Sequence, residues 1–141
     1  MMAKKLSAGI IPVRVFSEGP RYLLLRAYNY WDFPKGEVAD NEDPLAAACR
    51  EAAEETTLEE LRFPWGRDFC ETPPYGKGKV ARYYLAEAPS GKVDLPVSPE
   101  LGRPEHHEYR WLNADEAREL LVERLQAVLD WARRRVERGG M

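Results

Sequence analysis

The stretch GEVADNEDPLAAACREAAEETTL, residues 36–58, decides the fold of this chain. Asp43 is a typical helix N-cap and Pro44 suits the first helical position, so the sequence predicts a helix that runs from there to about Thr57. Inside this helix three carboxylates fall within five residues: Glu51, Glu54 and Glu55. Like charges three or four positions apart on a helix repel by about 0.2–0.5 kcal/mol per pair, so this crowding needs a reason.

The predicted helix has an apolar face and an acidic flank. At about 100° per residue, one stripe gathers the side chains that should pack on a sheet: Leu45, Ala48, Cys49, Ala52 and Thr56. The three glutamates lie about a third of a turn from this stripe rather than on the opposite, solvated side. One interpretation is a solvated acidic face with ion pairs such as Arg50 to Glu54. The other is a hard-oxygen site for Mg²⁺ or Mn²⁺, which the residues upstream favour.

The spacing upstream of the glutamates resembles the Nudix box, Gly-x5-Glu-x7-Arg-Glu-U-x-Glu-Glu-x-Gly-U, in which U is a bulky apolar residue. Seven of the nine defined positions match: Gly36, Glu42, Arg50, Glu51, Glu54, Glu55 and Leu58. Ala52 stands where a bulkier apolar residue is usual, and Thr57 replaces a glycine. Glycine suits the left-handed end of a helix, which a β-branched residue disfavours. Either the helix ends differently here, or Thr57 is strained.

The resemblance implies a single Nudix hydrolase domain over residues 1–141, with a mixed β-sheet sandwiched between helices in an α/β/α arrangement. It also implies hydrolysis of a nucleoside diphosphate linked to another moiety. The family's metal-binding carboxylates are matched by Glu51, Glu54 and Glu55. The backbone carbonyl of Lys35, just before the box glycine, is a further expected ligand. Arg50 and Glu42 match the pair that orients the helix and its preceding loop, and we count Arg50 with the catalytic group.

Outside the box, alternating apolar stretches predict strands at residues 7–16, 21–27, 67–71, 79–86 and 108–112, with a short strand at 92–95. Pro12 favours an edge strand or a bulge, and residues 31–36 are expected to form a rigid aromatic loop. Asn113 and Glu116 form a capping box before helical spacing that continues to Ala132. The order ββαβββα fits a mixed sheet between helices.

Composition limits the class of protein. A chain of 141 residues is one domain by length and is long enough to bury a core. Its net charge of −3 offers no general attraction for nucleic acid or anionic membranes. Cys49 and Cys70 have no CxxC or disulfide spacing, and no apolar stretch approaches a membrane span. Pro12 and Arg14 interrupt the N-terminal apolar run too early for a signal peptide. We therefore expect a cytoplasmic protein.

The flanks of the box resemble one branch of the family. WDFPKG (31–36), KGKVARYYLAE (77–87) and EHHEYRWL (105–112) are similar to the dinucleoside-tetraphosphate hydrolases, which cleave diadenosine tetraphosphate (Ap4A) asymmetrically into ATP and AMP. With the box, this resemblance covers most of residues 7–121. It implies a small nucleoside polyphosphate as substrate, with no membrane and no extended nucleic acid as partner. The implied cofactor is Mg²⁺, with Mn²⁺ as the alternative.

Five residues are candidates for binding this substrate: Lys79, Lys77, Tyr75, Tyr83 and Tyr30. The two lysines lie two positions apart, so on a strand they would point to one face and hold phosphates by charge, unless they are ordinary edge-strand lysines. Tyr75 lies near the offset at which the branch carries a tyrosine stacked on a base, with loop packing as the alternative. Tyr83 would flank the substrate or pack in the core, and Tyr30 would line one side of the site.

The expected mechanism is metal-assisted attack of water on phosphorus, with a glutamate as general base. Glu105 matches a carboxylate that related enzymes bring to the metal from a distant loop, and a solvated loop residue is the alternative. His106 and His107 are adjacent and cannot easily share one metal. We expect both to be exposed to solvent, with a phosphate contact by one of them as the alternative. The candidates for the general base are Glu51, Glu54 and Glu105.

Three other functions compete with Ap4A hydrolysis. RNA 5′-pyrophosphohydrolases also carry WxFP-x-G loops, but they would favour a broad basic track that the net charge does not indicate. A hydrolase of dNTPs or of diphosphoinositol polyphosphates is the second. The third is a binding or sensor module with the same fold, which would usually have lost carboxylates of the box that are all present here.

Overall fold

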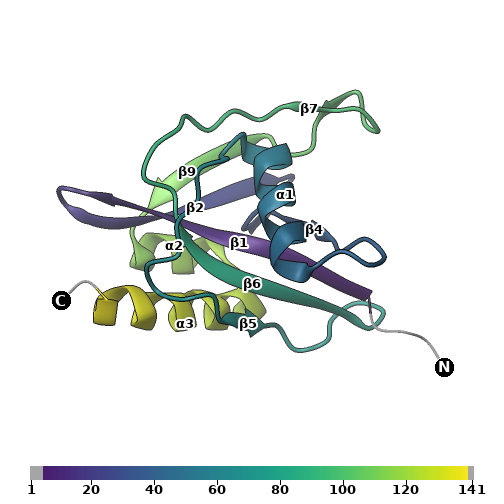
Figure 1. Cartoon of the computed structure of the whole chain (residues 1–141). Coiled ribbons are helices and arrows are strands. Elements are labelled where there is room, and N and C mark those ends of the chain that lie inside the picture. The colour runs from purple at the N-terminus through teal and green to yellow at the C-terminus, as the bar shows by residue number, and fades with distance from the viewer. Residues whose placement is uncertain (1–4, 140–141) are drawn as a thin grey trace.

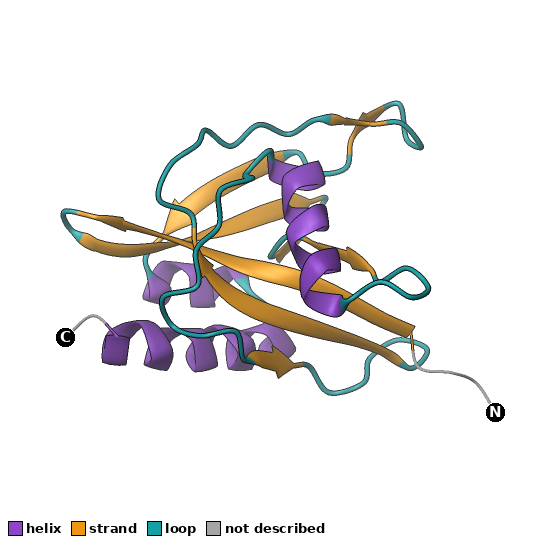
Figure 2. Ribbon diagram, in the orientation of Figure 1, coloured by secondary structure: helices purple, strands orange, loops and turns teal. Residues whose placement is uncertain are grey.

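The computed structural model describes residues 5–139 as a mixed β-sheet with helices on both faces (Figures 1 and 2). One helix covers one face and two helices cover the other, which confirms the α/β/α expectation. The ends of the expected domain, residues 1–4 and 140–141, lie outside the described range. In the described part, no helix is long and apolar enough to cross a membrane.

The elements follow in the order β1 (Lys5–Phe16), β2 (Gly19–Ala27), β3 (Tyr30–Asp32), β4 (Lys35–Glu37), α1 (Pro44–Thr56), β5 (Phe69–Glu71), β6 (Lys79–Glu87), β7 (Val97–Ser98), β8 (Arg103–Pro104), β9 (Glu108–Leu112), α2 (Ala114–Leu120) and α3 (Glu123–Gly139). The expectation of a loop at residues 31–36 was wrong, because this segment pairs with the edges of β2 and β1 as β3 and β4. The short strand expected at 92–95 does not form, and the nearest ladder is the β7–β8 pair.

The sheet is built around β1 and β6, which run parallel from the pair Lys5–Lys79 to the pair Val13–Glu87. All other ladders are antiparallel. The main path is β3-β2-β1-β6-β5, with β4 added to β1 and β9 added to β2. The edge of β1 away from β6 therefore pairs with β4 along its first half and with β2 along its second half.

Pro12 lies in the central strand β1, so the expectation of an edge strand or a bulge was wrong. On the edge of β1 away from β6, β4 pairs with residues 7–9 and β2 pairs with residues 13–16. The amide of Ile10 points to this edge and donates to the carbonyl of Pro34. Because amides two positions apart on a strand point the same way, the missing N–H of Pro12 falls in the gap between the two partner strands, where no ladder bond is lost.

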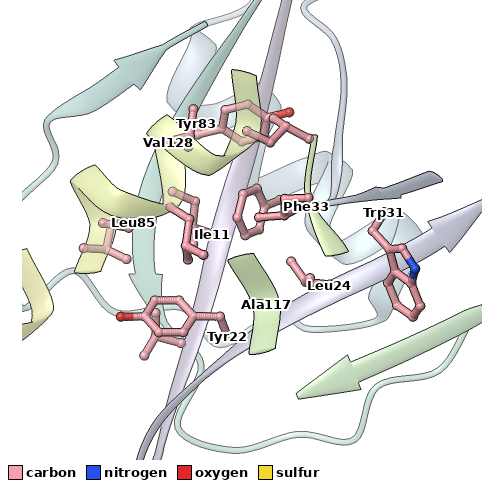
Figure 3. Close-up of a cluster of buried hydrophobic side chains, with 14 of the residues drawn as sticks. Ile11, Tyr22, Leu24, Trp31, Phe33, Tyr83, Leu85, Ala117 and Val128 are labelled. Carbon is pink, nitrogen blue, oxygen red and sulfur yellow. The ribbon is translucent and has the colours of Figure 1, made fainter. Parts of the chain in front are cut away.

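The two faces of β1 and β6 carry separate cores, because side chains alternate along a strand. Ile11, Tyr83 and Leu85 face α2 and α3, where they pack with Val128 and other buried residues (Figure 3). The opposite face packs on α1, with Ala8, Ile10, Tyr84 and Ala86 from the sheet and the small side chains of Ala47, Ala48 and Ala52 from the helix. These alanines bring the backbone of α1 near the sheet, so its acidic flank lies beside β4.

Helix α1 begins and ends at the predicted residues. The side chain of Asp43 accepts from the amide of Ala46 at 3.1 Å, and Pro44 opens the helix. Thr57 follows in the left-handed conformation, with φ 65° and ψ 8°, and its amide donates to the carbonyl of Ala53. Its hydroxyl donates to the carbonyl of Lys92 at 3.0 Å. The helix therefore ends in the left-handed conformation expected of the box glycine, and the backbone of Thr57 is strained there.

Candidate active site

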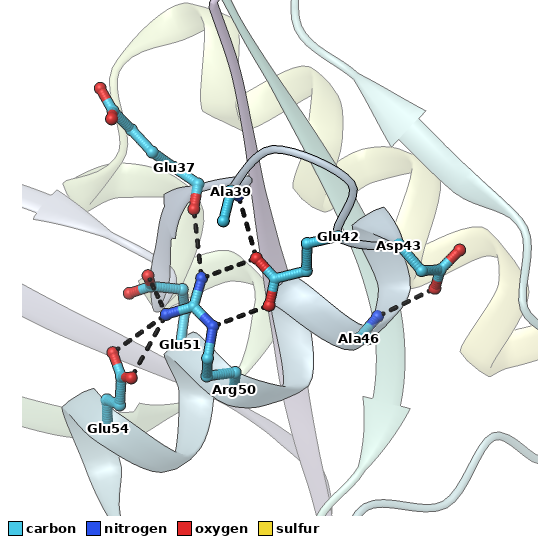
Figure 4. A network of polar contacts seen from close by, with 8 residues as sticks. All are labelled: Glu37, Ala39, Glu42, Asp43, Ala46, Arg50, Glu51 and Glu54. Carbon is cyan, nitrogen blue, oxygen red and sulfur yellow. Dashed lines mark hydrogen bonds and ion pairs between the residues drawn. The ribbon is translucent and has the colours of Figure 1, made fainter.

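Arg50 connects the loop before α1 to the glutamates of the helix (Figure 4). Its Nε and Nη2 atoms donate to the two carboxylate oxygens of Glu42, at 2.8 and 3.0 Å, and Nη2 also donates to the carbonyl of Glu37 at 3.2 Å. Its Nη1 atom donates to Glu51 at 2.9 Å and to Glu54 at 3.2 Å. The hydrogen bonds from Arg50 are the main cause that lowers the pKa of Glu42 to about 2. This network fixes the loop and the acidic flank relative to each other.

Gly36 makes room for the carboxylate of Glu51. Strand β4 carries Gly36 opposite Ala8 of β1 and beside α1. A Cβ atom at position 36 would lie 2.2 Å from Cδ of Glu51 and 2.3 Å from its Oε2, far inside van der Waals contact. The hydrogen atom of glycine thus allows the glutamate side chain to lie against the strand.

Glu55 is the buried carboxylate of the group, with only 8% of its surface exposed. Its Oε2 atom has no hydrogen-bond partner in the described part of the chain. Burial, then the hydrogen bond with Glu51 and the charges of Glu105 and Glu51, raise the pKa of Glu55 to about 10. A buried polar atom without a partner is costly in a folded protein, so this oxygen indicates a place where a ligand atom belongs.

Two residues from the loop before β9 meet Glu55. One ligand atom from each of Glu55, Glu105 and His106 lies within 4.8 Å of the other two. Nδ1 of His106 lies 3.8 Å from Oε1 of Glu55. Burial, followed by the charges of Lys35 and His107, lowers the pKa of His106 to about 4, so the ring is neutral near pH 7 and carries a free lone pair. The expectation that His106 is exposed was wrong, because the loop turns it in against α1.

This donor set fits a divalent cation. Carboxylate oxygens dominate, which suits Mg²⁺ or Mn²⁺, and a cation here would satisfy the orphaned Oε2 of Glu55 and favour its ionised form. Burial is also the main cause of the raised pKa of Glu105. The carboxylates of Glu51 and Glu54 belong to the same cleft but are bound by Arg50.

The cleft continues from the carboxylates to a cationic and aromatic end, with a volume of about 920 Å³. Tyr75 and Lys79 bond to each other through both backbone amides, at 2.9 Å, across a tight turn, so both side chains reach the cleft. The ammonium of Lys35 lies 3.6 Å from Asp32. Burial is the largest single effect on Lys35 and lowers its pKa, but Asp32, Tyr75, Glu55 and Tyr30 together outweigh it, so the net shift of the pKa is upward and the side chain stays charged.

Most of the expected site residues line this one cleft: Tyr30, Lys35, Gly36, Glu51, Glu54, Glu55, Tyr75, Lys79 and Glu105. Lys77 does not, because it lies at the exposed tip of the turn between Tyr75 and Lys79 rather than on β6. Leu58 is buried under the loop that follows β6. Arg50 and Glu42 support the cleft through the network described above.

Tyr83 lies in the core rather than beside the cleft. It is fully buried, its ring packs edge-on against Phe33, and its hydroxyl donates to Asp32 at 2.8 Å. The alternative of core packing therefore describes it, because residues of β6 beyond Lys79 pass under α3. Tyr83 acts on the cleft only through Asp32, which in turn pairs with Lys35.

The sequence reasoning did not place Arg124 in the cleft, and it offered His106 only as an alternative phosphate contact. His106 had a signal, since it follows Glu105 in the loop expected to reach the metal. Arg124 had none, because it enters the cleft only through the packing of α3 on the sheet.

The family model described as the NUDIX domain matches residues 4–132 of the chain. The chain belongs to the NUDIX family. This agrees with the box, with the α/β/α fold and with the acidic cleft beside α1. The Nudix chain is an enzyme, a pyrophosphohydrolase that acts on phosphorus-containing acid anhydrides.

Two named relatives and one solved structure are similar to this chain. The chain is 36% identical over 115 residues to the bis(5′-nucleosyl)-tetraphosphatase [asymmetrical] of Rattus norvegicus, a match that covers 77% of this chain and 75% of the rat protein. It is 29% identical over 106 residues to the RNA pyrophosphohydrolase of Roseobacter denitrificans, with 65% of each chain covered. The fold is similar to that of a C. elegans Ap4A hydrolase in a binary complex, with a TM-score of 0.72, 23% identity, and coverage of 89% and 93% of the two chains.

Proposed function

We propose that this Nudix enzyme hydrolyses Ap4A asymmetrically, in a metal-dependent reaction that yields ATP and AMP. The observation that carries the proposal is the cleft itself, which joins an acidic end, with the buried Glu55, to a cationic and aromatic end. A compound with two nucleosides joined by a phosphate chain offers matching chemistry: phosphates for the cations and metal, and a base for the aromatic rings. Similarity to asymmetrical tetraphosphatases supports the same substrate class.

The acidic end would hold the metal through Glu55 and Glu105, with Glu51, Glu54 and the carbonyl of Lys35 as the further expected ligands. A bound Mg²⁺ would supply charge for the nonbridging phosphate oxygens and would lower the pKa of a water molecule. Among these oxygens, those of Glu55 are buried, and Arg50 holds the carboxylates of Glu51 and Glu54 in place.

The other residues of the cleft bind and orient the substrate. Lys35 and Lys79 line the cleft, and their ammonium groups would hold phosphate oxygens. Tyr75 and Tyr30, both half-buried, offer ring surface to a nucleoside. A glutamate would accept the proton of the attacking water, and the candidates are still Glu51, Glu54 and Glu105.

RNA 5′-pyrophosphohydrolysis is the second candidate, because an RNA pyrophosphohydrolase is among the relatives. Its chemistry would use the same acidic end, but the RNA chain would leave the cleft over the surrounding surface. The cations of the cleft, such as Lys35, Lys79 and Arg124, are few and local. A short phosphate chain matches them better than a long track of backbone phosphates does.

Parallel incubations with Mg²⁺ and Ap4A, a 5′-triphosphorylated RNA oligomer, dNTPs or a diphosphoinositol polyphosphate would test the proposal. The products are resolved by anion-exchange chromatography. We expect ATP plus AMP from Ap4A to form with the highest kcat/KM. Faster release of phosphate or pyrophosphate from the RNA oligomer would reject Ap4A as the substrate. Binding without turnover of any substrate would indicate a sensor module.

A further inference from the structure

Arg124 lies in the first turn of α3 and reaches the aromatic end of the cleft. Its guanidinium stacks on the ring of Tyr75, with Cζ 3.8 Å from the ring centroid. Its Nη2 atom donates to the hydroxyl of Tyr30. These two contacts fix the position of the guanidinium, so it is a preorganised group rather than a mobile surface arginine.

Among the described residues, the charge of Arg124 has no anionic partner. Its Nε atom is buried and has no hydrogen-bond partner, and no carboxylate of residues 5–139 lies within the 4.0 Å of an ion pair. Asp32 is near enough to feel this charge but does not contact it. Arg50, by comparison, contacts three carboxylates. A half-buried cation is costly without an anion, so the site is built for an anion that the chain does not itself supply.

Lys35 lines the same cleft as Glu55, Tyr75 and Tyr30, and it is near enough to all three to interact with them electrostatically. Arg124 contacts those two tyrosines. Both cations are therefore near these tyrosines, and Lys35 is also near Glu55.

We infer that Arg124 binds a phosphate of the substrate and so selects substrates with an extended phosphate chain. A guanidinium has only donors, and its free N–H groups suit phosphate oxygens in a fork. A nucleobase carries no charge to offset the cation, and it would compete with Arg124 for the covered face of Tyr75. The inference rests on the proposed function in placing the phosphate chain in this cleft.

Arg124→Gln, with Arg67→Gln as the matched control, would test the inference. Arg67 also stacks on an aromatic ring, that of Phe63 at 5.3 Å, but it is exposed and does not line the cleft. The probe is bis(phosphonomethyl)phosphinate, a triphosphate analogue with P–C–P links that cannot be hydrolysed, titrated calorimetrically with Mg²⁺ present. We expect its Kd to rise at least about tenfold in Arg124→Gln, to rise less in Arg124→Lys, and to stay unchanged in Arg67→Gln.

An unchanged Kd in a folded Arg124→Gln protein would overturn the inference. So would a loss of adenosine binding with probe binding intact, because Arg124 would then serve the base. If Arg124→Gln does not fold, Arg124→Met keeps the apolar stem and gives the same test. With Ap4A, Arg124→Gln should raise KM about tenfold and change kcat less than threefold. The probe contains no nucleoside, so it tests Arg124 even if Ap4A proves not to be the substrate.

Discussion

The carboxylate of Glu51 fills the space into which a side chain at Gly36 would project, 2.2 Å from the position of its Cβ. Gly36 is not in the left-handed region, so its conformation does not require glycine. Glycine is required at this position because the side chain of Glu51 approaches so closely. The glycine and the glutamate of the box, which are 15 positions apart in the sequence, are thus two halves of one contact.

Gly36→Ala should therefore damage activity more than stability. The new methyl group would push away the end of a flexible side chain rather than backbone, so we expect the free energy of unfolding to change by less than about 1 kcal/mol. Displacement of Glu51 should lower kcat/KM about 100-fold. Urea unfolding and steady-state kinetics on the same preparations measure both effects.

Gly66→Ala is the converse control. Gly66 has φ 97° and open space around its Cβ position, so an alanine there is strained without any clash. We expect a loss of about 1 kcal/mol in stability with normal activity of the folded enzyme. Full activity in Gly36→Ala would show that the position of Glu51 does not matter for turnover.

The burial of Glu55 predicts a stability that depends on pH and metal. With its pKa raised to about 10 in the folded protein, against 4.5 in the unfolded chain, Glu55 keeps its proton between these values while the unfolded chain has lost it. Folding then takes up a proton, so stability falls as pH rises through this window. Without metal, the melting temperature of the wild type should fall more between pH 6 and 9 than that of Glu55→Gln.

Mg²⁺ should reverse this penalty, because a cation favours the ionised carboxylate. We expect Mg²⁺ to raise the melting temperature of the wild type, more so at pH 9 than at pH 6, and to have little effect on Glu55→Gln. Turnover by Glu55→Gln should fall at least about 100-fold. Near-normal turnover, or equal stabilisation of both proteins by Mg²⁺, would place the metal elsewhere.

The box allowed the sequence to predict the acidic flank of α1, since local spacing sets which helix residues share a face. The sequence also predicted the N-terminus of α1, because the capping by Asp43 and the preference of Pro44 for the first helical position are both local effects within one turn. The burial of His106 and the approach of Arg124 depend instead on how the loop before β9 and α3 pack on the sheet. Such contacts join residues about 50 and 94 positions apart, as in His106–Glu55 and Arg124–Tyr30, and no local pattern encodes them.

Arg50 and Glu42 should behave as one unit. Arg50→Lys keeps the charge but loses the fork that binds both oxygens of Glu42 and the side chains of Glu51 and Glu54. We expect a fall of about 10- to 100-fold in kcat/KM, because the glutamates lose their fixed positions. Glu42→Gln should have a similar effect through the same arginine.

The double variant provides the decisive measurement. If Glu42 acts through Arg50, the loss of activity in Glu42→Gln/Arg50→Lys should be close to that of either single variant. Losses that multiply would mean that the two residues act separately. Arg62→Lys is the control, because Arg62 pairs with Glu60 at the surface, at 3.4 Å, and should leave kcat/KM unchanged.

Thr57 occupies a left-handed position that would cost a glycine nothing, and its hydroxyl offsets part of this strain by binding the carbonyl of Lys92. Thr57→Val keeps the β-branched strain and loses that hydrogen bond, so it should destabilise the protein by about 1 kcal/mol. Thr57→Gly also loses the bond but relieves the strain, which outweighs the greater freedom of a glycine in the unfolded chain. We expect Thr57→Gly to be at least about 1 kcal/mol more stable than Thr57→Val in urea unfolding. A valine variant as stable as the glycine variant would show that position 57 carries no strain, and that its departure from the box is neutral for the fold.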